Sequence, residues 1–300
     1  MFKMSEYSFM AGLIAVGLAL LCYLLAFASV RLARRESALA LDGGPAGATI
    51  MGGQSVEVTR GPSGLAGYGS LIAWLALAFV SAALIFRTIA VGHGPFANMY
   101  EFSIAFAWGI LAAHVYFERR YHLRVLGLIA LPVAMLLLLY ATTIPSTSDP
   151  LVPALQNNLL LTTHVAVAIV AYGGFAVAFA AAALHLVASY TGSRRLPRLE
   201  LLDEISYRAV VIGFPFLTLV IVLGAVWANV AWGRYWGWDP KETSALVTWL
   251  IYAVYLHARS QRGWAGRPAA LILVIGFGAV LFTYLGGNLF FGGLHSYSGL

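Results

Sequence analysis

Long apolar runs separated by short polar stretches dominate the chain. Eight of these runs approach the roughly 20 residues that a helix needs to cross a bilayer. In chain order they are Phe9–Val30, Tyr68–Val91, Phe102–Phe117, Val125–Thr143, Leu159–Tyr190, Ala209–Val230, Thr243–Ala258 and Pro268–Phe290. The pattern predicts an all-α, polytopic integral membrane protein with about eight transmembrane helices.

Composition indicates the same class of protein. The 300 residues are 61% hydrophobic and 10% charged, whereas about a quarter of the residues in a soluble domain are charged. The single cysteine, Cys22, excludes a disulfide framework, a CxxC redox pair and a CxxCH haem attachment site within this chain. The net charge of +6 is not arranged as a basic stripe with interleaved aromatic residues, so no nucleic-acid binding is expected.

The basic residues indicate how the runs are oriented. All but four of the 18 Lys and Arg residues lie in alternate loops that would share one side of the membrane. The exceptions are Lys3, Arg87, Arg234 and Lys241. Because cytoplasmic loops are enriched in Lys and Arg, both termini are expected outside. The chain then divides into an N-terminal transmembrane helix (1–33), a Gly-rich cytoplasmic linker (34–67) and a transmembrane domain (68–300).

One segment on the predicted outer side, residues 227–243, is dense in indole rings. It reads WANVAWGRYWGWDPKET and holds four of the eight Trp residues of the chain. Gly233 and Gly237 between them would let a flat ligand approach the backbone. Asp239, Pro240 and Glu242 are residue types that begin a helix. An interfacial aromatic belt is the alternative interpretation of the Trp residues.

Three histidines fall where they suit a haem. His164 opens the fifth run and His295 follows the eighth, so both are expected near the Trp-rich segment. His257 lies 18 residues after Asp239, at the opposite end of the seventh run, roughly 27 Å away along a helix. Imidazoles ligate haem iron and indole rings stack on a porphyrin. A zinc site would need three or four clustered ligands, which this pattern does not offer.

Other polar residues have weaker assignments. The candidate contacts for haem propionates are Arg234 and Lys241. A polar cluster that supports the site, or is merely structural, comprises His93, Asn98, Tyr100 and Glu101. For any single histidine, a surface or hydrogen-bonded position is the alternative interpretation. The histidines interpreted as structural are His114, His122 and His185.

The stretch WGRYWGWDPKETSALVTWLIYAVYLHAR closely resembles the tryptophan-rich signature of the CcsA/ResC proteins of the System II pathway of cytochrome c biogenesis. These proteins belong to a haem-handling superfamily that includes CcmC and CcmF. The segments GHGPFANMYEF, LTTHVAVAIVAYGGFA and GGLHSY are similar to other segments of the family, so the resemblance covers most of the chain from Tyr68 onward. Eight spans agree with CcsA/ResC better than with the smaller CcmC or the larger CcmF.

The resemblance implies a subunit of a holocytochrome c synthase. Its activity would be haem transport across or within the membrane and covalent haem attachment to the CxxCH motif of apocytochrome c on the outer face. By this resemblance, His164 and His295 match the external haem ligands, and His257 matches a ligand within the membrane. The haem platform would comprise Trp227, Trp232, Trp236, Trp238 and Asp239. The substrate would be haem b, bound without a covalent bond to this chain, and no residue is assigned as a general acid or base.

The resemblance also implies a partner and a location. A CcsB/ResB-type membrane subunit would supply the second intramembrane haem ligand, and activity is expected to require it. The location would be the plasma membrane, or the thylakoid membrane in a plastid or cyanobacterium, with the Trp-rich segment outside.

Three other functions are weighed against this one. A CcmC-like haem delivery protein without ligation does not account for eight spans and a separate inner histidine. A b-type electron-transfer subunit would need a haem ligand pair at the inner face from this chain alone. A substrate transporter, the weakest of the three, would use the Trp residues as an interfacial belt.

Overall fold

The structure of the protein is a computed structural model that describes residues 1–42, 63–147, 155–156, 158–193, 196–261, 264–289 and 293–295. Within these ranges the chain forms eight α-helices, one short 3₁₀-helix and no β-strand. The elements are α1 (Phe2–Asp42), α2 (Ser63–Val91), α3 (Met99–Tyr121), η1 (Arg124–Leu126), α4 (Gly127–Thr142), α5 (Asn158–Thr191), α6 (Leu199–Trp232), α7 (Pro240–Ser260) and α8 (Arg267–Leu289). The all-α prediction is confirmed.

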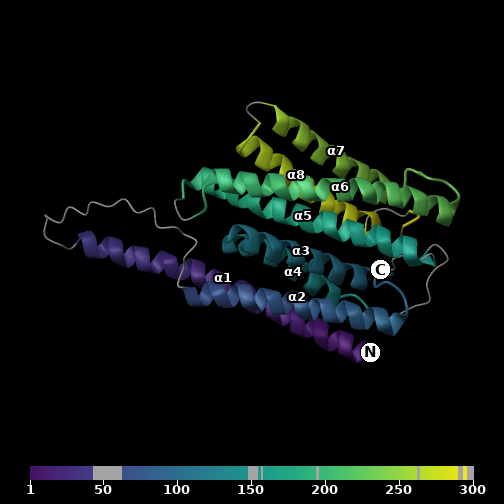
Figure 1. The fold of residues 1–300 in the computed structure, drawn as a ribbon, viewed down its shortest axis with the longest axis horizontal. Helices are drawn as coiled ribbons and strands as arrows, with labels where there is room; N and C mark the ends of the chain where they lie inside the picture. The colour runs from purple at the N-terminus through teal and green to yellow at the C-terminus, as the bar shows by residue number, and fades with distance from the viewer. Residues whose placement is uncertain are drawn as a thin grey trace.

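Consecutive helices run antiparallel and form a row of hairpins (Figure 1). The pair of α1 and α2 lies at one edge of the molecule, α3 and α4 lie beside it, α5 and α6 follow, and α7 and α8 lie at the other edge. α5 is central, because it contacts α3 and α8 as well as α6. The alternation brings the start of α1, the α6–α7 connection and residues 293–295 to one end of the bundle. We call this the Trp end and the opposite one the far end.

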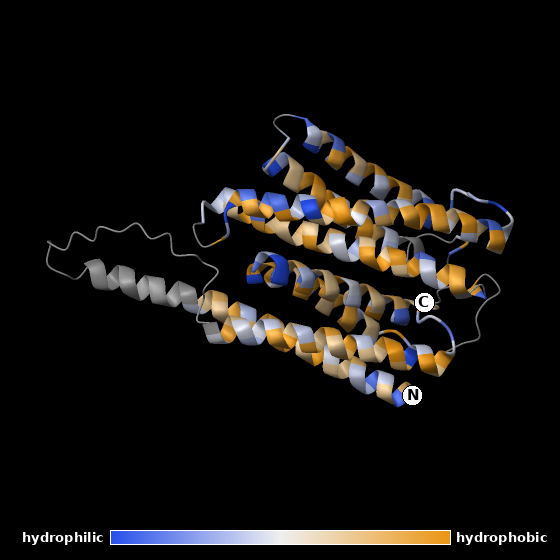
Figure 2. Cartoon of the chain, viewed as in Figure 1, coloured by the Kyte–Doolittle hydropathy of each residue, from blue (hydrophilic) through white to orange (hydrophobic). Residues whose placement is uncertain are grey.

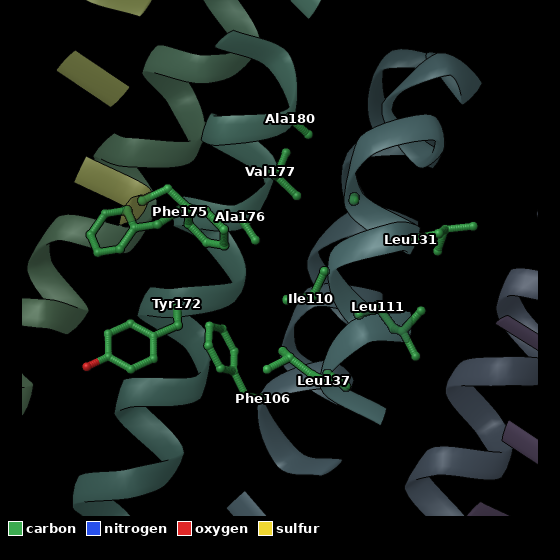
Figure 3. Close-up of a cluster of buried hydrophobic side chains, with 14 of the residues drawn as sticks. Phe106, Ile110, Leu111, Leu131, Leu137, Tyr172, Phe175, Ala176, Val177 and Ala180 are labelled. Carbon is green, nitrogen blue, oxygen red and sulfur yellow. The ribbon is translucent and has the colours of Figure 1, made fainter. Parts of the chain in front are cut away.

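Small residues let the central helices approach closely. A Cβ atom on Gly173 of α5 would lie 2.4 Å from the carbonyl oxygen of Gly109 on α3, so the two backbones touch here. Helix interfaces in membranes are enriched in such residues, because lipid gives helices no hydrophobic reason to associate. Nearby, the rings of Phe106 on α3 and Tyr172 on α5 pack with centroids 5.3 Å apart, among the side chains drawn in Figure 3.

Six helical segments in the described part of the chain are long and apolar enough to cross a membrane, namely α1, α2, η1 together with α4, α5, α6 and α8. Figure 2 shows hydrophobic residues along the middle of the helices and hydrophilic residues toward their ends. α3 and α7 have 23 and 21 residues, about 34 and 31 Å, but both carry charged residues. α3 accommodates charge because most of its surface packs on other helices. The structure therefore supports a multi-pass membrane protein, while eight crossings and their sidedness remain predictions.

Local sequence explains where three helices begin or end near the Trp end. Asn98 caps α3, since its side chain accepts a hydrogen bond from the Glu101 N–H at 2.9 Å. Gly233 ends α6 with a φ of 73°, which glycine adopts without strain. Asp239 and Glu242 form a capping box at the start of α7. The predicted helix start at Asp239 is confirmed.

Helices extend beyond the apolar runs that predict them. α1 continues to Asp42, α2 begins at Ser63, and α6 begins at Leu199, well before the predicted Ala209. Polar residues can continue a helix past the bilayer, so an apolar run marks the membrane and not the helix end. The predicted linker 34–67 falls mainly on residues 43–62, which lie outside the described residues.

Candidate functional site

A cavity opens at the Trp end between α3, α5, α6, α7 and the turn at residues 293–295. The space between its atoms amounts to about 1110 Å³, part of it open to solvent. The wall includes His164, His295, Trp227, Trp236 and Lys241. Two histidines from distant parts of the sequence therefore face one cavity.

His164 is held by α5 and by close packing on α6. Its imidazole stacks on the indole of Trp227, with ring centroids 6.4 Å apart and the planes 13° from parallel. It also rests on Gly224, where a Cβ atom would lie 2.9 Å from Cε1 of the ring. Among the described residues the buried Nδ1 has no hydrogen bond of standard geometry, although the Val220 carbonyl interacts with the ring. The two helices thus fix this ring at the cavity.

His295 reaches the cavity from the turn at residues 293–295. Its Nδ1 donates a hydrogen bond to Oδ1 of Asp239 over 2.7 Å. The ring lies edge-on to Trp232 at 4.9 Å and tilted to Trp227 at 5.6 Å. An ionised carboxylate only accepts hydrogen bonds, so Asp239 selects the tautomer of His295 with its proton on Nδ1. In that tautomer Nε2 carries the lone pair that a metal ligand needs.

Asp239 is 5% exposed and joins three segments of the chain. Its carboxylate accepts hydrogen bonds from His295, from the Leu294 N–H at 2.7 Å and from the Lys241 N–H at 2.9 Å. Burial alone would raise the pKa of Asp239, but the hydrogen bonds from His295 and from the two N–H groups outweigh burial and lower the pKa. The carboxylate also lies at the N-terminus of α7, where the helix dipole favours negative charge.

Glu242 shapes the Trp-rich loop. Its Oε2 accepts hydrogen bonds from the Gly237 N–H at 2.8 Å and the Asp239 N–H at 3.1 Å, which folds the loop back on α7. Trp238 between them has a φ of 55°, a left-handed conformation that costs a non-glycine residue roughly 1–2 kcal/mol. Trp238 is 69% exposed, and its ring meets the Trp236 ring edge-on at 5.7 Å. The loop therefore presents Trp236 to the cavity and leaves Trp238 on the surface.

The remaining platform residues lie deeper. Trp227 is 2% exposed, and its ring lies 4.8 Å from that of Trp232. Of the two candidate propionate contacts, Lys241 lines the cavity, while Arg234 is exposed and packs on Gly237. Burial lowers the pKa of Lys241 to about 8, although the charge of Asp239 raises it.

The predicted supporting cluster divides into separate roles. Asn98 lines the cavity. Glu101 forms a buried ion pair with Arg87 at 2.8 Å, and the Arg87 guanidinium lies 5.5 Å from the ring of Tyr100. Glu101 and Tyr100 therefore hold the start of α3 beside the cavity through Arg87. His93 donates from Nδ1 to the Gly94 carbonyl at 2.8 Å and is not among the residues that line the cavity.

His257 lies in the last turn of α7, at the far end, and its side chain is exposed. The length of α7 separates it from the cavity, as the 18-residue spacing from Asp239 predicts. Two other histidines of the far end are enclosed by protein, with His114 fully buried and His185 3% exposed. His122 caps α3 with a φ of 53°.

Two glycines at the site are missed by sequence reasoning. Gly224 lies one helical turn before Trp227, and Gly293 would place a Cβ atom 2.4 Å from Oδ2 of Asp239. A glycine inside an apolar helix is a signal of close packing that would have pointed to Gly224. The glycines that the sequence singles out behave differently. Gly233 is a helix cap, and Gly237 packs on the guanidinium of Arg234.

Comparison with known proteins identifies the family. The family model described as "Cytochrome C assembly protein" matches residues 96–295, which contain the cavity and both of its histidines. The chain belongs to the cytochrome c assembly protein family. It is 39% identical to the cytochrome c biogenesis protein CcsA of Guillardia theta, over 78% of this chain and 86% of that protein. It is 38% identical to CcsA of Microcystis aeruginosa, over 78% of this chain and 88% of that protein. The CcsA/ResC resemblance of the Trp-rich stretch is confirmed.

A solved structure shares the fold of this family member. The Cytochrome c Heme Lyase CcmF superposes with a TM-score of 0.59 over 93% of this chain and 47% of CcmF. The chain therefore spans about half the length of CcmF. At 20% sequence identity the similarity shows the fold alone.

Proposed function

We propose that this chain is the CcsA-type subunit of a System II cytochrome c synthase, which moves haem across or within the membrane and attaches it to apocytochrome c outside. One observation carries the proposal: His164 and His295 line the same cavity, and both pack on the indole of Trp227. The relatives named as CcsA cytochrome c biogenesis proteins support the assignment to this pathway.

The cavity suits haem as a substrate. His164 and His295 offer imidazole ligands for the iron, and the indoles of Trp227 and Trp236 suit the face of a porphyrin. Lys241 offers a positive charge to a propionate. No group of three or more His, Cys, Asp and Glu residues in the described part of the chain is placed to hold a bare metal ion. Haem b held by axial ligation, without a covalent bond, fits this set of residues.

The attachment chemistry requires positioning by this chain. Each cysteine S–H of the acceptor's CxxCH motif adds across one haem vinyl group. The sulfur bonds to one vinyl carbon, the hydrogen bonds to the other, and no group leaves. Holding haem and thiols in a fixed geometry lowers the barrier by proximity. His164 and His295 hold the iron, Trp227 and Trp236 orient the porphyrin plane, and Lys241 orients a propionate.

We place all eight helices across the membrane, with the Trp end outside. The location is the plasma membrane, or the thylakoid membrane in a plastid or cyanobacterium. α7 then carries the Trp-rich segment outside and His257 near the inner side. On α7, His257 continues a line of exposed apolar residues at spacings of three and four, namely Val247, Leu250 and Val254. A CcsB/ResB-type helix packed on this line would supply the second inner haem ligand.

The haem site is tested by the absorption spectrum of the full chain co-expressed with a CcsB/ResB-type subunit. We expect a bis-histidine haem spectrum that is lost or weakened in His164→Ala and in His295→Ala, and partly restored by excess imidazole. His122→Asn is the control, because His122 is a helix cap at the far end whose left-handed conformation asparagine tolerates. Unchanged spectra in both alanine variants would contradict the assignment of this cavity as the haem site.

Covalent attachment separates the proposed function from its alternatives. Co-expression with the partner and an apocytochrome c, in a host without other cytochrome c maturation, should produce covalent cytochrome. Bound haem without covalent product would favour a CcmC-like delivery protein. A haem that this chain binds alone at the far end, and that His257→Ala removes, would favour a b-type electron-transfer subunit.

A further inference from the structure

The two histidines of the cavity are held by different kinds of structure. His164 belongs to α5, a helix of 34 residues, and its ring is packed between Gly224 and Trp227 of α6. Its position therefore depends on the packing of α5 on α6. His295 belongs to a turn beyond α8, and the side chain of Asp239 holds it from one side. Moving this turn away from Asp239 does not require α5 and α6 to separate, because the turn follows α8 and bonds to the start of α7.

Asp239 contacts every residue of the turn at residues 293–295. Its Oδ1 accepts from Nδ1 of His295, and its Oδ2 accepts from the Leu294 N–H, each over 2.7 Å. Gly293 packs so closely that a Cβ atom there would lie 2.4 Å from Oδ2 and 2.9 Å from Cδ of Pro240. The His295 side chain is 17% exposed, whereas that of Asp239 is 2% exposed. In this pair the carboxylate of Asp239 is the more deeply buried group. The turn is attached to it by hydrogen bonds.

We propose that Asp239 is a latch for His295, and that His295 is the haem ligand displaced by the histidine of the acceptor's CxxCH motif, while His164 stays bound. The inference rests on the proposed function, because it concerns the haem held between these two histidines. Asp239 is a positioning residue in this scheme, since it acts on the haem through His295.

The latch links ligand strength to ligand position. A carboxylate that accepts a hydrogen bond from a ligating imidazole orients the ring and increases its basicity. When the turn leaves Asp239, His295 loses this support at the same time as it moves away. The incoming histidine then meets a weakened ligand on one side of the iron and an unchanged ligand, His164, on the other. The haem would stay bound to the synthase until the acceptor holds it.

The latch is tested by the rate at which cyanide binds the ferric haem of the full chain, purified with its partner subunit. Cyanide can bind only after one axial histidine dissociates, so the rate reports the weaker ligand. We expect Asp239→Asn and Gly293→Ala each to raise this rate about tenfold or more, which is the change expected when a hydrogen bond to a charged group is lost. Asparagine still caps a helix, so α7 keeps its start.

Matched controls make the same chemical changes elsewhere. Asp203→Asn alters a carboxylate at the far end that pairs with Arg259. Gly278→Ala alters a glycine of α8 with nothing within 4 Å of its added Cβ. Neither should change the cyanide rate. Rates in Asp239→Asn and Gly293→Ala that equal the wild-type rate, with haem bound, would overturn the latch.

A second experiment identifies the displaced ligand. The probe is a fluorescent peptide with the acceptor sequence in which serine replaces both cysteines, so that it binds through its histidine alone. In His295→Gly loaded with haem and imidazole, the imidazole takes the position of His295, and the apparent peptide Kd should rise in proportion to imidazole concentration. In His164→Gly with imidazole, the peptide Kd should not depend on imidazole.

The opposite dependence would show that His164 is displaced, and would overturn the inference while leaving the haem site intact. Absence of haem from the wild-type protein would instead contradict the proposed function. The two failures are therefore distinguishable in the same set of samples.

Discussion

His164 on α5 and His114 on α3 are both interior histidines, and the protein surrounds them in different ways. Each ring rests on a glycine: a Cβ atom would lie 2.9 Å from Cε1 of His164 at Gly224, and 3.2 Å from Cε1 of His114 at Gly127. His114 is fully buried at the far end, with Nε2 3.1 Å from Oε2 of Glu118. His164 lines a cavity and has an indole beside it instead of a carboxylate.

The difference shows what distinguishes a structural histidine from a candidate ligand. Glu118 also accepts hydrogen bonds from Tyr23 of α1 and Ser70 of α2, so the carboxylate ties three helices together. A buried polar group in lipid needs such partners. His114 has the Glu118 carboxylate 3.1 Å from Nε2, although neither ring nitrogen makes a hydrogen bond of standard geometry among the described residues. His164 instead faces space that a substrate can fill. Burial is common to both positions, and the chemistry of the neighbours separates them.

The two glycines give the sharpest test of this comparison. Gly224→Ala would force the ring of His164 away from its position, because a Cβ contact of 2.9 Å cannot be accommodated unchanged. Overpacking of this kind costs roughly 1–3 kcal/mol, so haem affinity should fall about tenfold or more. The measurement is the Soret absorbance per mole of purified protein.

Gly127→Ala is the counterpart at the far end, where the added Cβ would lie 2.7 Å from the Tyr23 ring. It should lower the thermal midpoint by an amount equivalent to about 1–3 kcal/mol and leave the Soret absorbance of the folded protein unchanged. Gly17→Ala, with nothing within 4 Å of the added Cβ, should change neither quantity. Equal loss of haem in Gly127→Ala and Gly224→Ala would break the comparison.

Replacing Glu118 by Gln tests whether the carboxylate beside His114 has a structural role. Among the described residues, His164 has no carboxylate beside it. Glutamine keeps the shape of the side chain, but Tyr23 and Ser70 donate to different oxygens of Glu118, and the amide nitrogen that replaces one oxygen cannot accept. We expect a loss of about 1–3 kcal/mol in stability, measured as a lower thermal midpoint in detergent at a fixed scan rate. The haem spectrum should not change. A normal midpoint with an altered spectrum would mean that the far-end cluster belongs to the haem site.

The helices are predictable from the sequence because hydrophobic periodicity and length are properties of each segment alone. Caps are predictable for the same reason: Asp239, Pro240 and Glu242 are close in sequence and form the capping box that they predict. The extent of α6 before Ala209 is not predictable from apolar length, because its first turns carry charged residues. The packing of α5 through Gly173 also depends on a contact with another helix, which no local pattern reveals.

The candidate site is predictable as a list of residues but not as a set of contacts. His164, His295 and Trp227 follow from their predicted depth in the membrane. The bond between Asp239 and His295 joins residues 56 positions apart, so a single sequence contains no signal for it. The exposure of Arg234 and Trp238 is likewise set by the hydrogen bonds of Glu242, which fold the loop back on α7.

Substitution of Lys241 has the smallest expected effect on haem affinity. It tests whether a positive charge, as well as the histidines and indoles, makes the cavity at the Trp end a haem site. Lys241 lines the cavity before the predicted span that begins at Thr243, and burial lowers its pKa to about 8. Below that pH the ammonium attracts a propionate, and above it the attraction is lost, so haem affinity should fall as pH rises through 8. A bound carboxylate raises the pKa of the amine, so haem binding should take up a proton just above this pH.

We expect the fall in affinity to be roughly fivefold, equivalent to about 1 kcal/mol. Haem transfer to an excess of a competing haem-binding protein, on either side of pH 8, measures it. Lys241→Met should bind haem more weakly below pH 8 and lose most of the pH dependence. Arg234→Gln is the matched control, because Arg234 is exposed at the loop surface, and it should keep the wild-type profile. A Lys241→Met profile identical to that of wild type would show that the cavity holds haem through its histidines and indoles alone, without help from charge.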